Sequence, residues 1–338
     1  MVTIKDVARE SGFSVSTVSR ALADSDLIPK HSKTKIKSVA EKLWYIPNLT
    51  AKSLKNNKFY NFGVITFAGE ELGFSHNLFS GILNNFINEI GKNKFDVTVL
   101  SKHLVDSGED LVAYCKSRNL NGVFMLSGDF SNKEMKKLQS SDIPTVVVDG
   151  FKNDESDNSY YVSSNNREVM KKLTSLAIQK GHKKIVYVHG EDIYVTRERI
   201  AGFKEAIESA GMDFNPDMLV AGHYYDMSYV SDVIDGILTK EVVPTCIFMP
   251  DDFCAIKAYD VLHERGIRIP EDISIAGFDG LEYVKHIYPK MATVIQNVAE
   301  LGKTCAKIMI SLINGEEPQH LTLIGADIYN GESIRTIK

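Results

Sequence analysis

Short apolar runs alternate with helical patterns through most of the chain, from Phe62 onward. This alternation predicts βαβ units and parallel sheets, because strands that are buried on both faces are apolar throughout and are joined by crossover helices. The periodicity leaves open whether the strands form one large sheet or two smaller lobes. Seven runs are predicted to be strands: Gly63–Phe67, Asp96–Leu100, Gly122–Leu126, Thr145–Asp149, Lys184–His189, Thr245–Met249 and Ile273–Phe278.

The first 46 residues have a different pattern, that of three short helices. Thr3 begins a capping box, and Gly12 ends the first apolar stripe. Ser14 is placed to cap a second helix, Val15–Leu22, and a third helix is predicted over about Lys33–Leu43. Two helices joined by a tight turn, with a third packed across them, predict a small all-α helix-turn-helix head.

Charge is divided unevenly along the chain. Residues 1–58 contain 11 Lys and Arg and 5 Asp and Glu, a net charge of +6, whereas the whole chain carries -5. Residues 59–338 therefore carry -11. A basic head on an acidic body indicates that the head alone meets a polyanion. With 338 residues and 43% apolar content, the chain is long enough for this head and a larger body with its own core.

Several classes of protein are disfavoured by what the sequence lacks. No run approaches 18 apolar residues and the N-terminus has no basic stretch before an apolar one, so we expect neither a membrane span nor a secretory signal. We see no dinucleotide, phosphate-loop or hydrolase motif, and expect no cofactor and no enzymatic activity. The cysteines form no CxxC pairs, which predicts free thiols in a cytoplasmic protein without a metal site. They are Cys115, Cys246, Cys254 and Cys305.

The second helix of the head would enter the major groove and offer its first side chains to base edges. Val15 could pack on a thymine methyl group, and Ser16 could exchange a hydrogen bond with a base. Thr17, Ser19 and Arg20 suit phosphate contacts, and Arg20 could also reach a guanine. The alternative is a three-helix domain that binds protein, in which the lysines of the head are only a solvated face.

Four stretches of the sequence together carry a family resemblance. The head motifs are specific, and the likeness continues through the body, so that it spans nearly the whole chain. The stretches are Val2–Ala8 with Gly12–Leu22, Tyr45–Asn48 with Ala51–Leu54, Arg199–Phe203 with Asp251 and Asp252, and Gly266–Asp279. In these stretches the chain resembles the lac/galactose repressor (LacI/GalR) family of transcription regulators.

The resemblance implies a head (1–46), a hinge (47–58) and an effector-binding and dimerisation body (59–338). The body would have two lobes of the periplasmic sugar-binding type with parallel sheets, one of about 60–160 and 291–319 and the other of about 161–290 and 320–338. The chain would pass between the lobes near Tyr160–Ser163, Tyr288–Val294 and Gln319–Asp327.

For DNA binding, the resemblance implies a homodimer on a near-palindromic double-stranded operator. Two hinge helices would insert paired Leu54 side chains into the minor groove and kink the duplex. The chain ends without a leucine heptad tail, which favours a dimer over a tetramer. The candidate DNA-binding residues are Thr3, Ser14, Val15, Ser16, Thr17, Ser19, Arg20, Asn48, Ala51, Lys52, Leu54 and Lys55.

For effector binding, the resemblance implies a small molecule between the lobes, a sugar or sugar derivative. Carboxylates would accept hydroxyl protons and Arg199 would donate a fork of hydrogen bonds. Asp251 stands where many members have Asn, and either selects a ligand with extra donors or pairs with Arg199. The aromatic candidates, for which Tyr225 is as good as Tyr224, could instead be core residues, and Asp279 could be a turn residue. The candidates are Phe74, Asp149, Arg199, Tyr224, Asp251 and Asp279.

Two other functions stay open at this point. One is a catabolite-control regulator of the same family whose body responds to a phosphorylated phosphocarrier protein. The other is an α/β sugar-processing enzyme that uses strand-end carboxylates as acid and base, although the basic head would then be unexplained.

Overall fold

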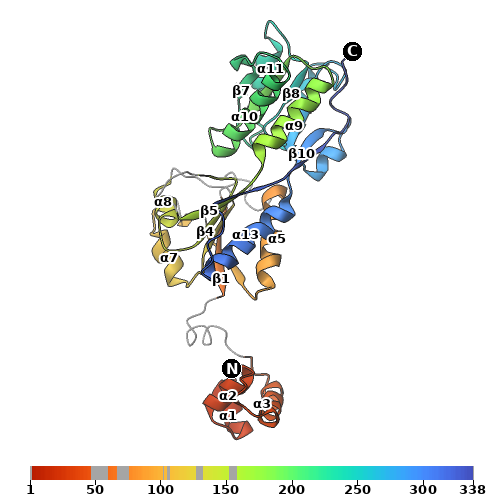
Figure 1. Ribbon diagram of the computed structural model, residues 1–338. Helices are drawn as coiled ribbons and strands as arrows, with labels where there is room; N and C mark the ends of the chain where they lie inside the picture. Colours follow the sequence, from red (N-terminus) through yellow and green to blue (C-terminus); the bar gives the residue numbers. More distant parts are fainter. Residues whose placement is uncertain are drawn as a thin grey trace. The chain divides into compact units, whose positions relative to one another are not determined.

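The computed structural model divides the chain into two compact units, Met1–Phe59 and Tyr60–Lys338 (Figure 1). The residues it describes are 2–46, 60–66, 76–101, 103–104, 107–126, 132–151 and 158–337.

The head consists of three helices: α1 (Ile4–Ser11), α2 (Val15–Leu22) and α3 (Lys30–Lys42). Gly12, at φ 75°, ends α1 in the left-handed conformation that glycine adopts without strain and turns the chain toward α2. The helix-turn-helix prediction is confirmed, and α3 begins three residues earlier than expected, directly after Pro29.

The core of the head is small and comes equally from its three helices. Val7, Val18 and Ile36 are fully buried, one from each helix. Ala8, Ala21 and Ala40 fill the spaces between them. The small alanine side chains let the three helices pack closely together. The charged side chains of all three helices lie on the outside.

The body contains two six-stranded sheets, which answers the question that periodicity left open. The first sheet has the order β11-β5-β4-β3-β1-β2 and is parallel throughout. The second has the order β12-β10-β9-β8-β6-β7, and only its edge strand β12 is antiparallel. The strands are β1 (Asn61–Thr66), β2 (Asp96–Val99), β3 (Val123–Leu126), β4 (Thr145–Val148), β5 (Ser159–Ser164), β6 (Ile185–His189), β7 (Leu219–Ala221), β8 (Cys246–Phe248), β9 (Ser274–Asp279), β10 (Ala292–Ile295), β11 (Leu321–Ile324) and β12 (Asp327–Tyr329).

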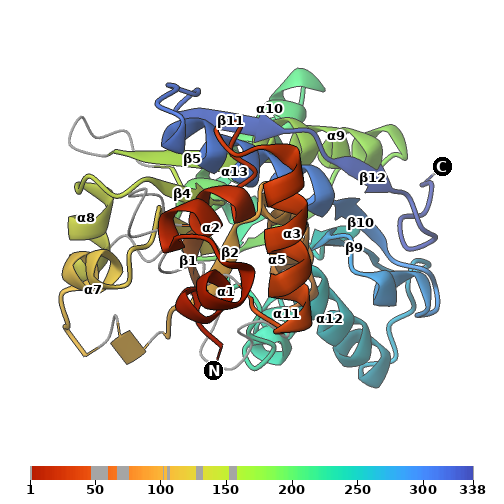
Figure 2. The same cartoon turned by 90° about the horizontal axis from the view of Figure 1, so that it is seen from below.

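Helices cover both faces of each sheet. In the first lobe, α5 and α13 lie side by side on one face, and α7 and α8 lie on the other (Figure 1). In the second lobe, α9 and α10 cover one face and α11 and α12 the opposite one (Figure 2). The helices are α5 (Asn77–Gly91), α7 (Leu111–Ser117), α8 (Lys133–Gln139), α9 (Asn166–Gln179), α10 (Tyr194–Ser209), α11 (Val230–Leu238), α12 (Asp252–Glu264) and α13 (Val298–Ile313), with 3-10 turns η2 (Pro216–Met218) and η3 (Glu282–Lys285).

The chain crosses between the lobes three times, and two of the crossings lie later than expected. β5 runs to Ser164 in the first sheet, so the first crossing follows Ser164 instead of lying within 160–163. β10 pairs with β9 in the second sheet, so the second crossing follows Ile295. The third lies between Ile324 and Asp327, inside the predicted range. Both positions were expected from the family resemblance, and β5, with the sequence SYYVSS, was not among the predicted strands.

Two further observations concern the helices and the cysteines of the described ranges. None of the helices in them is long and apolar enough to cross a membrane. All four cysteines are buried, and none forms a disulfide.

Candidate DNA-contacting surface and interlobe site

The start of α2 is organised by Ser14. Its hydroxyl oxygen accepts a hydrogen bond from the backbone N–H of Thr17 at 3.2 Å, which caps the helix. The same oxygen lies 2.9 Å from Ser16 Oγ and 2.8 Å from Thr17 Oγ1. Ser14 therefore positions the two hydroxyls that follow it, and its own capacity is largely used within the helix.

The outer face of α2 carries the side chains that remain available. Val15 is 41% exposed, and Ser16 and Arg20 are also exposed. Arg20 makes no ion pair with any described residue. Ser19 is half-buried, and Thr3 is tied to Asp6, whose carboxylate accepts from the Thr3 hydroxyl at 2.7 Å.

Six of the candidate site residues cannot be placed. They lie outside the described ranges: Asn48, Ala51, Lys52, Leu54, Lys55 and Phe74.

In the body, three of the candidate aspartates lie where strands end. Asp149 follows β4 of the first sheet, whereas Asp251 and Asp279 stand at the carboxyl ends of β8 and β9 in the second. Side chains at the carboxyl ends of parallel strands gather at one edge, where α/β proteins bind ligands. With Arg199 of α10 and Tyr224 and Tyr225 of the segment after β7, these residues form what we name the interlobe cluster.

A chain of hydrogen bonds joins Arg199 to Asp149. Arg199 Nε donates to Asn166 Oδ1 at 2.8 Å, and Asn166 Nδ2 donates to Ser163 Oγ at 3.1 Å. The Ser163 hydroxyl then donates to Asp149 Oδ1 at 2.8 Å. Ser163 lies in β5 and Asn166 in α9, so the chain of bonds follows the first crossing from one lobe to the other.

A second chain of hydrogen bonds reaches Asp279 through Gln296. The Ser164 hydroxyl donates to Gln296 Oε1 at 2.6 Å, and Gln296 Nε2 donates to Asp279 Oδ1 at 2.8 Å. The other carboxyl oxygen, Asp279 Oδ2, is buried without a hydrogen-bond partner in the described structure. A buried polar atom is nearly always bonded, so this oxygen is a candidate for ligand contact.

Of the two interpretations left open for Asp251, the pairing with Arg199 is replaced by a capping role, and the contact with a ligand stays a prediction. Asp251 does not form an ion pair with Arg199. Its Oδ1 accepts from the backbone N–H of Cys254 at 2.9 Å, which caps α12, and its Oδ2 accepts from the Tyr225 N–H at 2.8 Å. The carboxylate thus fixes the backbone that carries Tyr225.

Arg199 is held firmly while part of its guanidinium can still donate to a ligand. The side chain is 3% exposed, Nη1 donates to the Pro250 carbonyl at 2.9 Å, and the guanidinium carbon lies 3.4 Å from the centre of the Phe278 ring. Tyr224 covers it from 5.5 Å and bonds through its hydroxyl to Thr196 at 2.9 Å. Among the described residues no bond of Nη2 meets hydrogen-bond geometry, although the buried Tyr187 hydroxyl interacts with the guanidinium, so Nη2 retains capacity to donate to a ligand.

Burial sets the acid–base state of the cluster. It raises the pKa of Asp149, Asp251 and Asp279, and that of Asp252 to about 8. Asp252 is bonded within the second lobe, where it accepts from Thr293 Oγ1 at 2.6 Å and from the Leu281 N–H at 2.7 Å. Low solvation strengthens any hydrogen bond that a ligand makes here.

The backbone is strained at three positions of the cluster. Asp149 (φ 55°), Tyr225 (φ 62°) and Asp279 (φ 119°) all lie at positive φ, which costs a non-glycine residue about 1–3 kcal/mol. Such strain is typical of functional sites, because the surrounding structure has to impose it.

Asn166, Ser163 and Gln296 were missed by the sequence analysis. Each acts through a hydrogen bond to a candidate residue, and no single motif marks it. The polar run at the end of β5 was the available signal.

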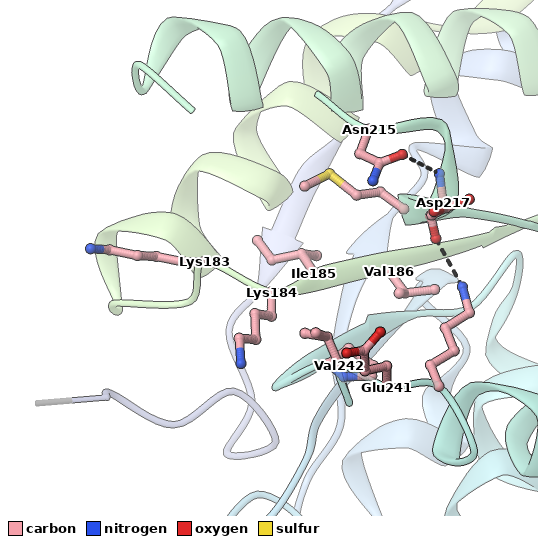
Figure 3. Close-up of a pocket in the computed structure, with 11 residues that line it drawn as sticks. Lys183, Lys184, Ile185, Val186, Asn215, Asp217, Glu241 and Val242 are labelled. Atoms are coloured by element: carbon pink, nitrogen blue, oxygen red, sulfur yellow. Dashed lines mark hydrogen bonds between the residues drawn. The ribbon is translucent and has the colours of Figure 1, made fainter. Parts of the chain in front are cut away.

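A surface pocket of 520 Å³ lies elsewhere, at the start of β6 and β8 (Figure 3). It is lined by Lys183, Lys184, Asn215 and Asp217, among others, and Lys240 closes one side by donating to the Asp217 carbonyl at 2.9 Å. None of the candidate effector residues that the structure describes lines it.

Comparisons with known proteins give two family matches, one in the head and one in the body. Residues 3–48 match the family described as bacterial regulatory proteins, lacI family, and residues 175–334 match the periplasmic binding protein-like domain. The probable HTH-type transcriptional repressor ExuR of Bacillus subtilis is 30% identical over 94% of this chain and 93% of its own length. The HTH-type transcriptional repressor PurR of Vibrio atlanticus is 27% identical, also over 94% and 93%.

Two solved structures share the fold. A lac repressor dimer bound to operator and the anti-inducer ONPF is 20% identical with a TM-score of 0.82, covering 99% of both chains. A complex of the regulator CelR with cellobiose is 22% identical with a TM-score of 0.74, covering 98% of this chain and 100% of that one. These two likenesses concern the fold, whereas the ExuR relative and the matched head show that the chain belongs to the lacI family of bacterial regulatory proteins, which are transcription regulators and not enzymes.

Proposed function

We propose that the chain is a cytoplasmic repressor that binds an operator as a homodimer and is controlled by a sugar or sugar derivative held between its lobes. The observation that carries the effector part is the interlobe cluster. There, buried Asp279 Oδ2 has no partner in the described structure, and Nη2 of the Arg199 guanidinium retains capacity to donate beside it.

The chemistry of the cluster suits a polyol. A sugar hydroxyl can donate to Asp279 Oδ2 while a second hydroxyl accepts from Arg199 Nη2, and the flat face of a ring can lie on Tyr224. Asp149 belongs to the first lobe and Arg199 to the second, so a ligand that contacts both favours one lobe arrangement over others.

DNA binding is assigned to the exposed face of α2. Val15 and Ser16 would meet base edges and Arg20 a phosphate, with the basic charge of residues 1–58 drawing the head to the duplex. The hinge, with Leu54 as a minor-groove wedge, would couple the lobe arrangement to the spacing of the two heads. The CelR complex with cellobiose supports a sugar as the effector.

The experiment measures operator binding by fluorescence anisotropy, with duplexes from the promoter of the gene itself and of its neighbours, while sugars are added one at a time. We expect one sugar to change operator affinity in the wild type. Asp279→Asn, which has no carboxylate acceptor, should lose that response and retain operator binding. If no sugar changes the affinity, the effector part fails; if no duplex binds in a salt-dependent manner, the repressor assignment fails.

A further inference from the structure

His76 is a fully buried histidine at the N-terminus of α5, in the first lobe. Its Nδ1 accepts a hydrogen bond from the backbone N–H of Leu78 at 3.3 Å. A ring nitrogen that accepts carries no proton, so the proton of the neutral ring is on Nε2. Burial lowers the pKa of His76 to about 4, which keeps the ring neutral near pH 7. His76 therefore presents an Nε2–H donor.

This donor has no acceptor. Nε2 is buried without a hydrogen-bond partner in the part of the chain that is described. The other fully buried histidine, His182, is different: its Nδ1 lies 2.9 Å from Thr245 Oγ1 and its Nε2 3.0 Å from the Arg335 carbonyl oxygen. His182 is a satisfied structural residue, whereas half of the hydrogen-bonding capacity of the His76 ring is unused.

The rings around His76 come from both lobes. Phe79 of the first lobe lies 5.0 Å from it, centre to centre, and Tyr225 and Phe253 of the second lobe lie at 4.3 and 5.3 Å. Tyr225 is fixed through its backbone to Asp251, and the electrostatic neighbours of its hydroxyl include Asp279. His76 thus borders the interlobe cluster through its contact with the ring of Tyr225.

We propose that His76 contacts the effector, with Nε2–H donating a hydrogen bond to a ligand oxygen while Asp279 Oδ2 accepts one from a ligand hydroxyl. The inference rests on the proposed function, since it needs a ligand between the lobes. It also narrows the ligand class. A molecule with several hydroxyl groups supplies an acceptor to one lobe and a donor to the other, whereas an ammonium group offers His76 nothing to bind.

Two substitutions distinguish the Nε2–H donor of His76 from its two structural roles, the ring contact with Tyr225 and the cap of α5. His76→Phe keeps a ring against Tyr225 and removes Nε2–H, whereas His76→Asn keeps an acceptor to cap α5 and removes the ring. His320→Phe is the matched control, because His320 is an exposed histidine of the first lobe that contacts Tyr160 and Phe151 away from the cluster.

The affinity of the full chain for ribose, galactose, maltose and cellobiose is measured by calorimetry. For a sugar that binds the wild type, we expect both His76 variants to raise Kd about 5- to 30-fold and His320→Phe to leave it unchanged. An unchanged Kd in whichever His76 variant folds would refute the contact while the proposed function stands. If none of the four sugars binds the wild type, the sugar assignment fails, and this inference with it.

A second readout follows the ring itself. Long-range ¹H–¹⁵N spectra of the full chain, assigned with His76→Asn, should show the Nε2–H tautomer in the free protein and a shift of that resonance when the bound sugar is added. If the resonance does not shift when the bound sugar is added, His76 is a purely structural histidine and the proposal is overturned.

Discussion

The hydroxyl of Ser164 donates a hydrogen bond of 2.6 Å to the side-chain oxygen of Gln296, which ties the first crossing between the lobes to the second. Gln296 also donates to Asp279, so the carboxylate proposed to bind the effector is joined to both crossings. A change in the hydrogen bonding of Asp279 therefore acts directly on the two chain segments that connect the lobes.

Gln296→Ala should lower the free energy of unfolding by about 1–3 kcal/mol, because it leaves buried polar groups of Ser164 and Asp279 without partners. It should also weaken sugar binding, since Asp279 is no longer oriented. Urea unfolding and calorimetry measure the two effects. Gln319→Ala is the control, because that glutamine is exposed, and equal effects from both substitutions would contradict the link.

Gly190→Ala should disturb the site without touching a polar group. A Cβ at Gly190 would overlap the ring of Tyr224, which would have to leave its place over Arg199 and its bond to Thr196. We expect a sugar response reduced at least tenfold. Gly236→Ala has open space around it within α11 and should stabilise that helix by about 0.5–1 kcal/mol without altering the response. An unaltered sugar response in Gly190→Ala would show that the position of Tyr224 does not matter.

Arg20→Ala should weaken binding to every duplex and lower the slope of log K against log salt by about one, as expected for one lost phosphate contact. Arg9→Ala removes an equal charge from α1, where Arg9 already pairs with Asp6 at 2.9 Å. Anisotropy titrations at several salt concentrations measure the slopes. If both variants lose the same slope, DNA binding depends only on the total charge of the head and not on a specific Arg20–phosphate contact.

The stability that His76 contributes should depend on pH between about 6.5 and 4. Its folded pKa of about 4 lies below the ordinary value of 6.5, so the unfolded chain binds the proton first. The contribution is complete above pH 6.5 and falls, by up to about 1.4 kcal/mol per pH unit, as the pH drops toward 4. The difference in unfolding free energy between wild type and His76→Asn should follow this curve. A difference that stays constant from pH 8 to 4 would contradict it.

The sequence predicted most of the strands because their buried runs are rich in Val, Ile, Leu and Phe, as in β3 and β6. It missed β5 because Ser159, Ser163 and Ser164 interrupt the apolar pattern, although they are buried. The hydroxyls of Ser163 and Ser164 serve the interlobe hydrogen bonds, so the local composition reflects a site and not a loop.

The candidate site was predictable as a set of strand-end side chains, but their individual roles were not. Asp251 and Asp279 look alike in the sequence, yet the first has both oxygens occupied by backbone N–H groups and the second keeps one unpaired. His76 carries no signal at all, because its character depends on rings brought from residues 225 and 253 by the fold. Distances of this kind depend on tertiary packing, which no local pattern encodes.

Three passages of the chain between the sheets also limit how the body can be divided. Because β11 returns to the first sheet after α13, and β12 goes back to the second, neither lobe is a continuous piece of polypeptide. A protease that cuts one passage leaves the halves still connected by the other two. Neither lobe can therefore be produced by truncating the gene.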